Sequence, residues 1–230
     1  SYYTEGGSIY DVTLPNNMVE VGHYDTSPFT GGTFNGAWGV YPYLPSGNLL
    51  VSDIEGGLYI LGPTYTRGCY LEGTVTDAVT TSTVNGASIS VTGTNLTTTS
   101  DLVGAYSTGY HSAGTYTVEV TAPGYVTFTA TAVLLQTGQV TLLDVQLVPL
   151  PGFIVPGTVV ETGTTTGIQG AQVFFDDGVL QYSVTTNASG SFSTASIPEG
   201  TYDVYIGAWG WHPLCISGLV VNATTPAQTY

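Results

Sequence analysis

The sequence predicts an all-β protein built in part from two copies of one small module. Polar and apolar residues alternate in short runs, for example at residues 115–120 and 201–206, as they do in strands with one buried face. Turn pairs such as Asn85-Gly86 and Asp177-Gly178 separate these runs. No stretch shows sustained helical periodicity, so the 230 residues are expected to fold as strands and turns.

Charge is scarce in this chain and almost entirely negative. It carries 16 acidic residues and one cation, Arg67, which gives a formal net charge of −15. Without lysine it has no P-loop lysine and no Schiff base, and one cation is too few to bind a nucleic-acid backbone. Hydrophobic residues make up 42% of the chain, which argues against disorder. No apolar run approaches the ~20 residues of a membrane helix, so no membrane insertion is expected.

Residues 1–65 form a predicted β-segment of their own. Strand-like runs lie at residues 9–12, 19–26, 34–42 and 45–61. The stretch from Phe34 to Ile60 resembles the end of an LVIVD-repeat β-propeller, a type found in bacterial surface proteins. One blade needs about 40 residues and a closed propeller at least four blades, so this segment cannot close one. The resemblance implies a propeller-derived segment that either continues upstream in the natural chain or packs on something else.

An internal repeat follows this segment. Three motifs recur in order 84 to 86 residues later: Gly73-Thr74-Val75 as Gly157-Thr158-Val159, Asn85-Gly86-Ala87 as Gln169-Gly170-Ala171, and Gly114-Thr115-Tyr116 as Gly200-Thr201-Tyr202. The repeat predicts two modules, residues 66–150 and 151–230. Gly114 and Gly200 are expected to supply a positive φ at strand entries, with Tyr116 and Tyr202 packing inward.

The order of these motifs resembles the carboxypeptidase regulatory-like domain, an Ig-like, prealbumin-like seven-stranded sandwich related to the collagen-adhesin B repeats. The resemblance covers both modules and implies tandem β-sandwiches without catalytic activity. Collagen-adhesin B repeats often carry an internal bond between a lysine and an Asn or Asp. That bond cannot form in a chain without lysine.

The second module is expected to lack its last strand. The first module ends with a strand-like run at residues 140–147, and its counterpart would begin near Thr229-Tyr230, where the sequence stops. An unpaired strand edge invites pairing with another chain, so self-association through open edges is predicted. Trimming or proteolysis of the chain is the alternative explanation.

Composition points to a location outside the cell, either extracellular or on a bacterial cell surface. Low lysine with abundant Thr, Gly, Val and Tyr is typical of secreted β-proteins and removes most trypsin-like cleavage sites. Cys69 and Cys215 could form a disulfide, the alternative being two buried thiols. Sequons begin at Asn95, Asn187 and Asn222, although a Thr-rich chain produces such triplets by chance.

No sequence motif for catalysis is present. The chain has no Cys-x-x-Cys, His-Glu-x-x-His or Gly-x-Ser-x-Gly pattern, and its three histidines are isolated. Asp176-Asp177 is expected at a hairpin tip, with a loose Ca²⁺ site as the alternative and no other cofactor. Trp211 aligns with Tyr125 and is expected in the core. Trp209 is expected to face outward, where it could contact a glycan.

These observations favour a non-enzymatic extracellular structural protein, either a surface stalk or a self-assembling filament subunit held by strand pairing. The alternative is a carbohydrate- or protein-binding accessory module of a larger secreted bacterial protein. A third reading is a fragment of a secreted hydrolase whose catalytic domain lies upstream. Because the chain is so acidic, any self-assembly should strengthen with added salt.

Overall fold

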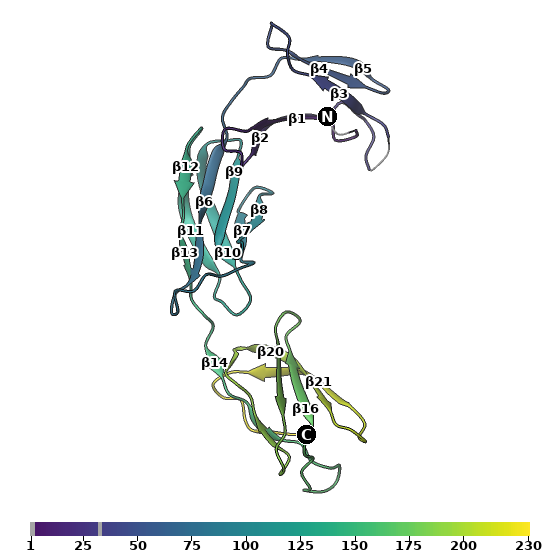
Figure 1. The fold of residues 1–230 in the computed structure, drawn as a ribbon, viewed down its shortest axis with the longest axis vertical. Helices are drawn as coiled ribbons and strands as arrows, with labels where there is room; N and C mark the ends of the chain where they lie inside the picture. Colours follow the sequence, from purple (N-terminus) through teal and green to yellow (C-terminus); the bar gives the residue numbers. More distant parts are fainter. Residues whose placement is uncertain (1–2, 32–33) are drawn as a thin grey trace. The chain divides into compact units, whose positions relative to one another are not determined.

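A computed structural model describes residues 3–31 and 34–230, so Ser1, Tyr2, Gly32 and Thr33 of the predicted N-terminal segment lie outside the described residues. Within the described ranges the chain forms 22 strands and no helix, which confirms the all-β prediction (Figure 1). Tertiary contacts divide it into two units, one of residues 1–121 and 127–147, the other of residues 122–126 and 148–230. The described part of the chain contains no helix that is long and apolar enough to cross a membrane.

The N-terminal β-segment belongs to the first unit and contains two small antiparallel sheets. Its strands are β1 (Gly7–Asp11), β2 (Val19–Tyr24), β3 (Ala37–Tyr41), β4 (Leu49–Asp53) and β5 (Gly57–Leu61). β1 pairs with β2, and the other three strands follow the order β3-β4-β5 (Figure 1). Asp53 accepts hydrogen bonds from the amides of Glu55 and Gly56, which fixes the tight turn between β4 and β5.

The first sandwich follows in the same unit. Its strands are β6 (Cys69–Asp77), β7 (Ser88–Val91), β8 (Thr97–Thr99), β9 (Ala105–Tyr110), β10 (Gly114–Thr121), β11 (Phe128–Leu135), β12 (Val140–Leu142) and β13 (Val145–Leu147). One sheet has the order β11-β10-β7-β8. In the other, β6 pairs with β9 on one side and with β12 and β13 on the other. Alternate residues such as Val118, Val120, Ile89 and Val91 point inward and are buried.

The second sandwich repeats this plan. Its strands are β14 (Gly152–Phe153), β15 (Pro156–Thr158), β16 (Gln172–Asp176), β17 (Gln181–Thr185), β18 (Ser191–Ser193), β19 (Ile197–Pro198), β20 (Gly200–Gly207), β21 (Leu214–Val221) and β22 (Gln228–Thr229). One sheet has the order β17-β16-β20-β21, which matches β8-β7-β10-β11 in the first copy. β15 pairs with β18 and with β22, and β14 pairs with β19.

The sequence repeat is also a repeat of strand register. Ile89 pairs with Val120 in the first sandwich, and Val173 pairs with Ile206 in the second, as the sequence offset requires. The register of β10 against β11 shifts after Tyr116, and that of β20 against β21 shifts after Tyr202. Two sandwiches with the same strand order, register and irregularity confirm the tandem architecture.

The second sandwich has a short closing strand, β22. β22 pairs parallel with β15, as β13 pairs parallel with β6. Tyr230 continues this pairing, since its amide donates to the Thr158 carbonyl at 3.0 Å and its carbonyl accepts from the Val160 amide at 2.7 Å. Residues 228–230 therefore occupy the position of the strand that the sequence analysis expected to be missing.

Candidate functional site

The three histidines and the acidic side chains of the described residues are spread over the two units. None of them form a group of three or more His, Cys, Asp or Glu side chains that could hold a metal ion. His23 lies on the surface with its Nδ1 3.3 Å from a Glu20 carboxylate oxygen and 3.2 Å from the Ser8 hydroxyl. His111 and His212 are exposed as well. The sites with functional content are therefore strand edges, exposed side chains and the contacts that join the N-terminal segment to the first sandwich.

One face of the β3–β5 sheet is apolar and exposed. Tyr41, Leu50 and Ile60 form one row across the three strands, and Leu58 lies on the same face beside Ser52. Tyr41, Leu58 and Ile60 are 51%, 61% and 64% exposed. We call these four residues, Tyr41, Leu50, Leu58 and Ile60, the outer apolar face. The opposite face buries Leu49 and Val51, so apolar residues occupy both sides of a single sheet layer.

The edge strand of this sheet, β5, has no protection against pairing. Among the described strands it pairs only with β4, and its register is continuous from Gly57 to Leu61. Residues 56–62 contain neither a charged side chain nor a proline. Edges are normally blunted by charge, proline or a bulge. We refer to the outward side of Gly57–Leu61 as the β5 edge.

Two long uncharged edges of the described chain, β11 and β21, are interrupted. β11 and β21 are edge strands without charged residues, but each contains a register shift against its neighbour. Ala132 in β11 has φ of 60° and its counterpart Gly218 in β21 has φ of 79°. Such bulges bend and twist an edge away from regular pairing. The edge strands β9 and β17 are also uncharged and regular. The β5 edge differs from them because it carries large exposed apolar side chains, Leu58 and Ile60.

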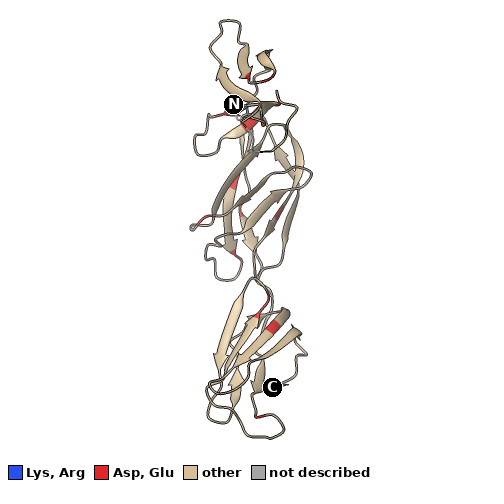
Figure 2. Ribbon diagram, turned by 90° about the vertical axis from the view of Figure 1, so that its right-hand side faces the viewer, with Lys and Arg blue, Asp and Glu red and all other residues tan. Residues whose placement is uncertain are grey.

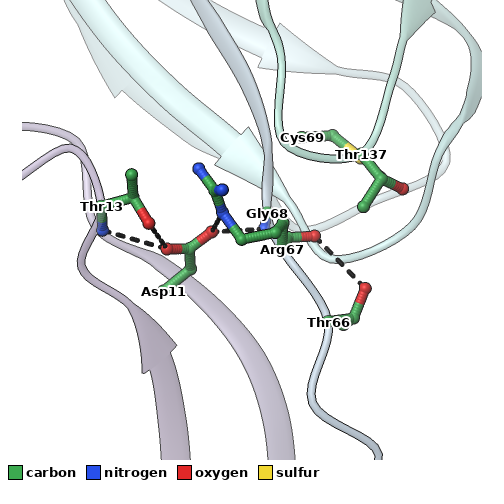
Figure 3. Close-up of polar contacts among 7 residues, drawn as sticks. All are labelled: Asp11, Thr13, Thr66, Arg67, Gly68, Cys69 and Thr137. Atoms are coloured by element: carbon green, nitrogen blue, oxygen red, sulfur yellow. Dashed lines mark hydrogen bonds and ion pairs between the residues drawn. The ribbon is translucent and has the colours of Figure 1, made fainter.

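The single cation of the chain ties the N-terminal segment to the first sandwich (Figure 3). Arg67 Nε lies 3.0 Å from Asp11 Oδ2, and the Gly68 amide donates to the same oxygen at 2.8 Å. The other carboxylate oxygen accepts from the amide and hydroxyl of Thr13 at 3.0 and 2.6 Å. We call Asp11, Thr13, Arg67 and Gly68 the Asp11 joint. It connects the end of β1 to the start of β6 across 56 residues of sequence.

Neighbouring contacts extend this connection. The Asn17 amide donates to Glu72 Oε1 and to the Thr108 carbonyl, each at 3.0 Å. Val19 is buried against Gly68 and Gly109, where a Cβ on either glycine would overlap the valine side chain. The hydroxyl of Tyr70 is buried in the same region and has no hydrogen bond of good geometry to the described residues. The segment is thus docked by packing as well as by polar contacts.

The pKa of Asp11 is lowered in the folded protein. Burial favours the neutral acid, but the hydrogen bonds from Thr13 and the Gly68 amide, together with the nearby polar hydroxyl of Tyr70, outweigh it and lower the pKa. A carboxyl group with a lowered folded pKa contributes stability above its unfolded pKa, about 3.9 for Asp. This contribution is lost progressively as the pH falls toward the folded value.

We therefore expect Asp11→Asn to lower the free energy of unfolding of the first unit by about 1–3 kcal/mol at neutral pH, since donors are left without the carboxylate. The variant should also lose less stability than the unaltered chain between about pH 4 and about pH 2. Urea unfolding of the full chain, with hydrogen exchange assigning each transition to a unit, measures both effects. Glu119→Gln, at an exposed position on β10, is the control. Equal pH dependence in Asp11→Asn and the unaltered chain would contradict the role given to this carboxylate.

The predicted strand-entry residues lie where the repeat placed them, but the reason for the glycines differs from the prediction. Gly114 and Gly200 begin β10 and β20, and neither has a positive φ. A Cβ at Gly114 would instead crowd the Tyr116 ring, whereas a Cβ at Gly200 would make ordinary contact with the Tyr202 ring. The Tyr116 hydroxyl donates to the Ser112 carbonyl at 3.0 Å, and the Tyr202 hydroxyl donates to the Pro198 carbonyl at 2.9 Å. In each copy, one tyrosine hydroxyl thus holds the segment before the strand by a hydrogen bond to a carbonyl four residues earlier.

The cysteines do not form the disulfide that the sequence allowed. Both are free thiols, Cys69 buried in β6 of the first unit and Cys215 exposed on β21 of the second. The Cys69 thiol instead faces the Thr137 hydroxyl, with Sγ 4.0 Å from Oγ1 (Figure 3).

The two tryptophans of the second sandwich are both at the surface. Trp209 is fully exposed in the β20–β21 turn, as expected. Trp211 is 46% exposed, so the expectation that it lies in the core is wrong. The Trp211 amide donates to the Ala208 carbonyl, and Gly210 has φ of 83°, so a tight turn carries both rings out of the sandwich.

Asp176 and Asp177 lie at the tip of the β16–β17 hairpin and cap its turn. Asp176 Oδ1 accepts from the Gly178 amide at 2.7 Å, and Asp177 Oδ1 accepts from the amides of Val179 and Leu180 at 2.8 and 2.6 Å. These contacts give the pair a turn-forming role.

Comparison with known proteins identifies the repeated modules. The family model for the carboxypeptidase regulatory-like domain matches residues 70–148 and again residues 154–229. No curated protein matches the chain. Similar solved structures include a Streptococcal ancillary pilin, with 15% identity, a TM-score of 0.41 and coverage of 81% of this chain and 75% of that one. The shaft pilin SpaA from Lactobacillus rhamnosus GG has 10% identity, a TM-score of 0.36 and coverage of 72% and 96%. The Bacillus anthracis TIE protein has 13% identity, a TM-score of 0.34 and coverage of 80% and 39%. These likenesses are too distant to carry a functional conclusion.

Proposed function

The chain belongs to the carboxypeptidase regulatory-like domain family, and on that premise we propose that it is a non-enzymatic structural protein of the cell surface or extracellular space. Copies of the chain assemble through strand pairing, as a surface stalk or a filament. The observation that carries this proposal is the β5 edge, which is regular, uncharged and unpaired among the described strands.

The β5 edge suits pairing with a neighbouring copy on two grounds. Its backbone groups can continue the ladder of the β3–β5 sheet, which is how strand addition supplies affinity. The outer apolar face beside it would be covered in the same step, removing Leu58 and Ile60 from water. The antiparallel order β3-β4-β5 also supports the proposal that this segment derives from an LVIVD-repeat propeller blade, in which such strands pack between neighbouring sheets.

The distribution of charge also supports the β5 edge as the surface through which copies of the chain pair. Acidic side chains are dispersed over both units (Figure 2). Within β3–β5, Asp53 is buried and bonded to the Thr26 hydroxyl at 2.7 Å, and residues 56–62 carry no charge. The one exposed carboxylate of this stretch, Glu55, lies in the turn before β5 and accepts from the Gly36 amide at 2.9 Å. The β5 edge is therefore a place where two copies of a chain with net charge −15 can meet with little local repulsion. The remaining long-range repulsion falls as salt is added.

Leu58→Lys is expected to abolish or strongly weaken assembly. The substitution places a charge on the outer apolar face of an edge strand, which is a common natural block to edge pairing. Sedimentation and electron microscopy of the full chain, over a range of added salt, measure the effect. The unaltered chain should assemble more strongly as salt increases.

Leu102→Lys is the matched control because it makes the same chemical change at an exposed turn of the first sandwich, outside the β3–β5 sheet. Assembly of this variant should equal that of the unaltered chain. Loss of assembly in both variants would show that added charge in general is responsible. Normal assembly of Leu58→Lys, or a strictly monomeric unaltered chain, would count against the β5 edge.

The alternative function is a carbohydrate- or protein-binding accessory module. The observation that favours it is Trp209, whose ring is fully exposed at the tip of a turn. Exposed tryptophans offer a flat apolar surface with one polar N–H group. Glycan binding by a chain that stays monomeric, with that binding lost in Trp209→Ala, would select this alternative.

A further inference from the structure

The three sequons of the chain, equivalent in sequence, differ in structure. Asn187 Oδ1 accepts hydrogen bonds from the Ser189 amide, the Ser189 hydroxyl and the Ser191 amide at 2.9, 2.8 and 3.0 Å. Asn222 Oδ1 accepts from the amide and hydroxyl of Thr224 at 2.8 and 2.7 Å. In both sequons the asparagine side chain and the hydroxyl two residues later are therefore engaged in holding a turn.

The Asn95 side chain does not hold its turn, because the neighbouring Thr94 side chain makes the hydrogen bonds that do so. The Thr94 hydroxyl donates to the Val91 carbonyl at 2.7 Å and accepts from the Leu96 amide at 3.1 Å, which fixes the turn between β7 and β8. The Asn95 side chain is exposed, and the described residues give it no hydrogen-bond partner. Thr97 is also exposed, at the first position of β8. The Asn95 sequon can thus be engaged without breaking a turn.

The surface beside Asn95 has space for an attached group. A groove of about 420 Å³ lies within the first unit, lined by residues that include Asn95, Leu96, Glu20, His23, Tyr110 and His111. The Tyr110 and His111 rings lie 4.2 Å apart between centroids. Its walls therefore combine aromatic surface with donors and acceptors, which suits a polar, ring-shaped group such as a sugar.

We propose that Asn95 is a site of N-linked glycosylation and that Asn187 and Asn222 are not. The side-chain nitrogen of Asn95 would form a bond to the anomeric carbon of an activated oligosaccharide, a glycosyl phosphate carried on a lipid. The bond from that carbon to the phosphate oxygen breaks, and the proton lost from the amide leaves with the phosphate group. The inference rests on the proposed location outside the cell but is independent of assembly through the β5 edge.

Peptide mapping of the full chain, purified from the cells that make it, tests the assignment. Release of the glycan by an amidase in heavy-oxygen water converts a modified asparagine to aspartate that carries the label. We expect the label at Asn95 and unlabelled asparagine at Asn187 and Asn222. Asn95→Gln, made in the same cells, should lose the glycan mass from the intact chain, whereas Asn187→Gln should keep it.

Two results overturn the proposal. One is an unmodified Asn95 on a chain that antibody labelling of intact cells places at the surface. The other is a glycan found on Asn187 or Asn222 with Asn95 bare. Neither result bears on the Leu58→Lys assembly assay, so failure of this inference is distinguishable from failure of the proposed function.

Discussion

Replacement of Tyr202 by alanine is expected to lower the free energy of unfolding of the second unit by about 3–5 kcal/mol. Tyr202 is 1% exposed, and its ring meets Phe175 edge-on at 6.4 Å and Tyr182 at 6.2 Å between centroids. Truncation would leave a cavity in the middle of the second sandwich. It would also leave the Pro198 carbonyl without the hydroxyl that now donates to it at 2.9 Å.

Two further variants separate the contribution of the Tyr202 hydroxyl from that of its buried ring. Tyr202→Phe removes only the hydroxyl and should cost about 0.5–1.5 kcal/mol. Burial raises the pKa of Tyr202 to about 12, so this hydroxyl stays a donor at neutral pH. Tyr205→Ala, on the exposed side of the same strand, should have a much smaller effect. Urea unfolding, followed by hydrogen exchange, measures the free energy of unfolding of all three variants. A similar loss of stability in Tyr205→Ala and Tyr202→Ala would contradict the assignment of Tyr202 to the core.

Gly73→Ala is expected to destabilise the first unit by about 3 kcal/mol, at the upper end of the range for overpacking. A Cβ at this position would overlap the backbone carbonyl of Leu143, which lies between β12 and β13. Backbone cannot move aside as a flexible side chain can, so the whole closing strand would have to shift from β6. The equivalent residue of the repeat, Gly157, is confined in the same way by the Phe192 ring and the Gln228 carbonyl.

Gly207→Ala is the matched control for Gly73→Ala. Gly207 ends β20 with a φ outside the left-handed region, and a Cβ there would meet no atom within 4 Å. This variant should be as stable as the unaltered chain, or more stable by about 0.4–1 kcal/mol because alanine restricts the unfolded state. Thermal unfolding of the two variants gives the comparison. A Gly73→Ala chain as stable as Gly207→Ala would show that the closing strand is not held as closely as the structure indicates.

Several features of the fold were predictable because they depend on local pattern. Alternation over residues 115–120 and 201–206 marked β10 and β20, since a strand with one buried face must alternate. The Asp176-Asp177 hairpin tip followed from turn chemistry. The repeated Gly-Thr-Val and Gly-Thr-Tyr motifs marked equivalent positions in two copies. The need for glycine at Gly73 came from the close approach of the Leu143 carbonyl, which the sequence does not show.

The candidate sites were harder to predict because they depend on which surfaces meet. Nothing around Asp11 or Arg67 indicates that they pair across 56 residues. The one usable signal was that Arg67 is the only cation available to any carboxylate. Trp211 was placed in the core by alignment with Tyr125, and a tight turn through Gly210 carried it to the surface instead. The three sequons were likewise indistinguishable until hydrogen bonds separated Asn95 from Asn187 and Asn222.

By itself the sequence determined the fold class, the two-fold repeat and the scarcity of positive charge, because composition and short-range periodicity encode strands, turns and net charge. Only the tertiary structure decided that β5 is a regular, unprotected edge and that Asp11 receives the single cation. Only it showed that the Cys69 thiol is buried in β6 and the Cys215 thiol is exposed on β21. Pairing, burial and edge exposure depend on residues brought together from distant parts of the chain, and the contacts of a residue are set by the packed sheets around it.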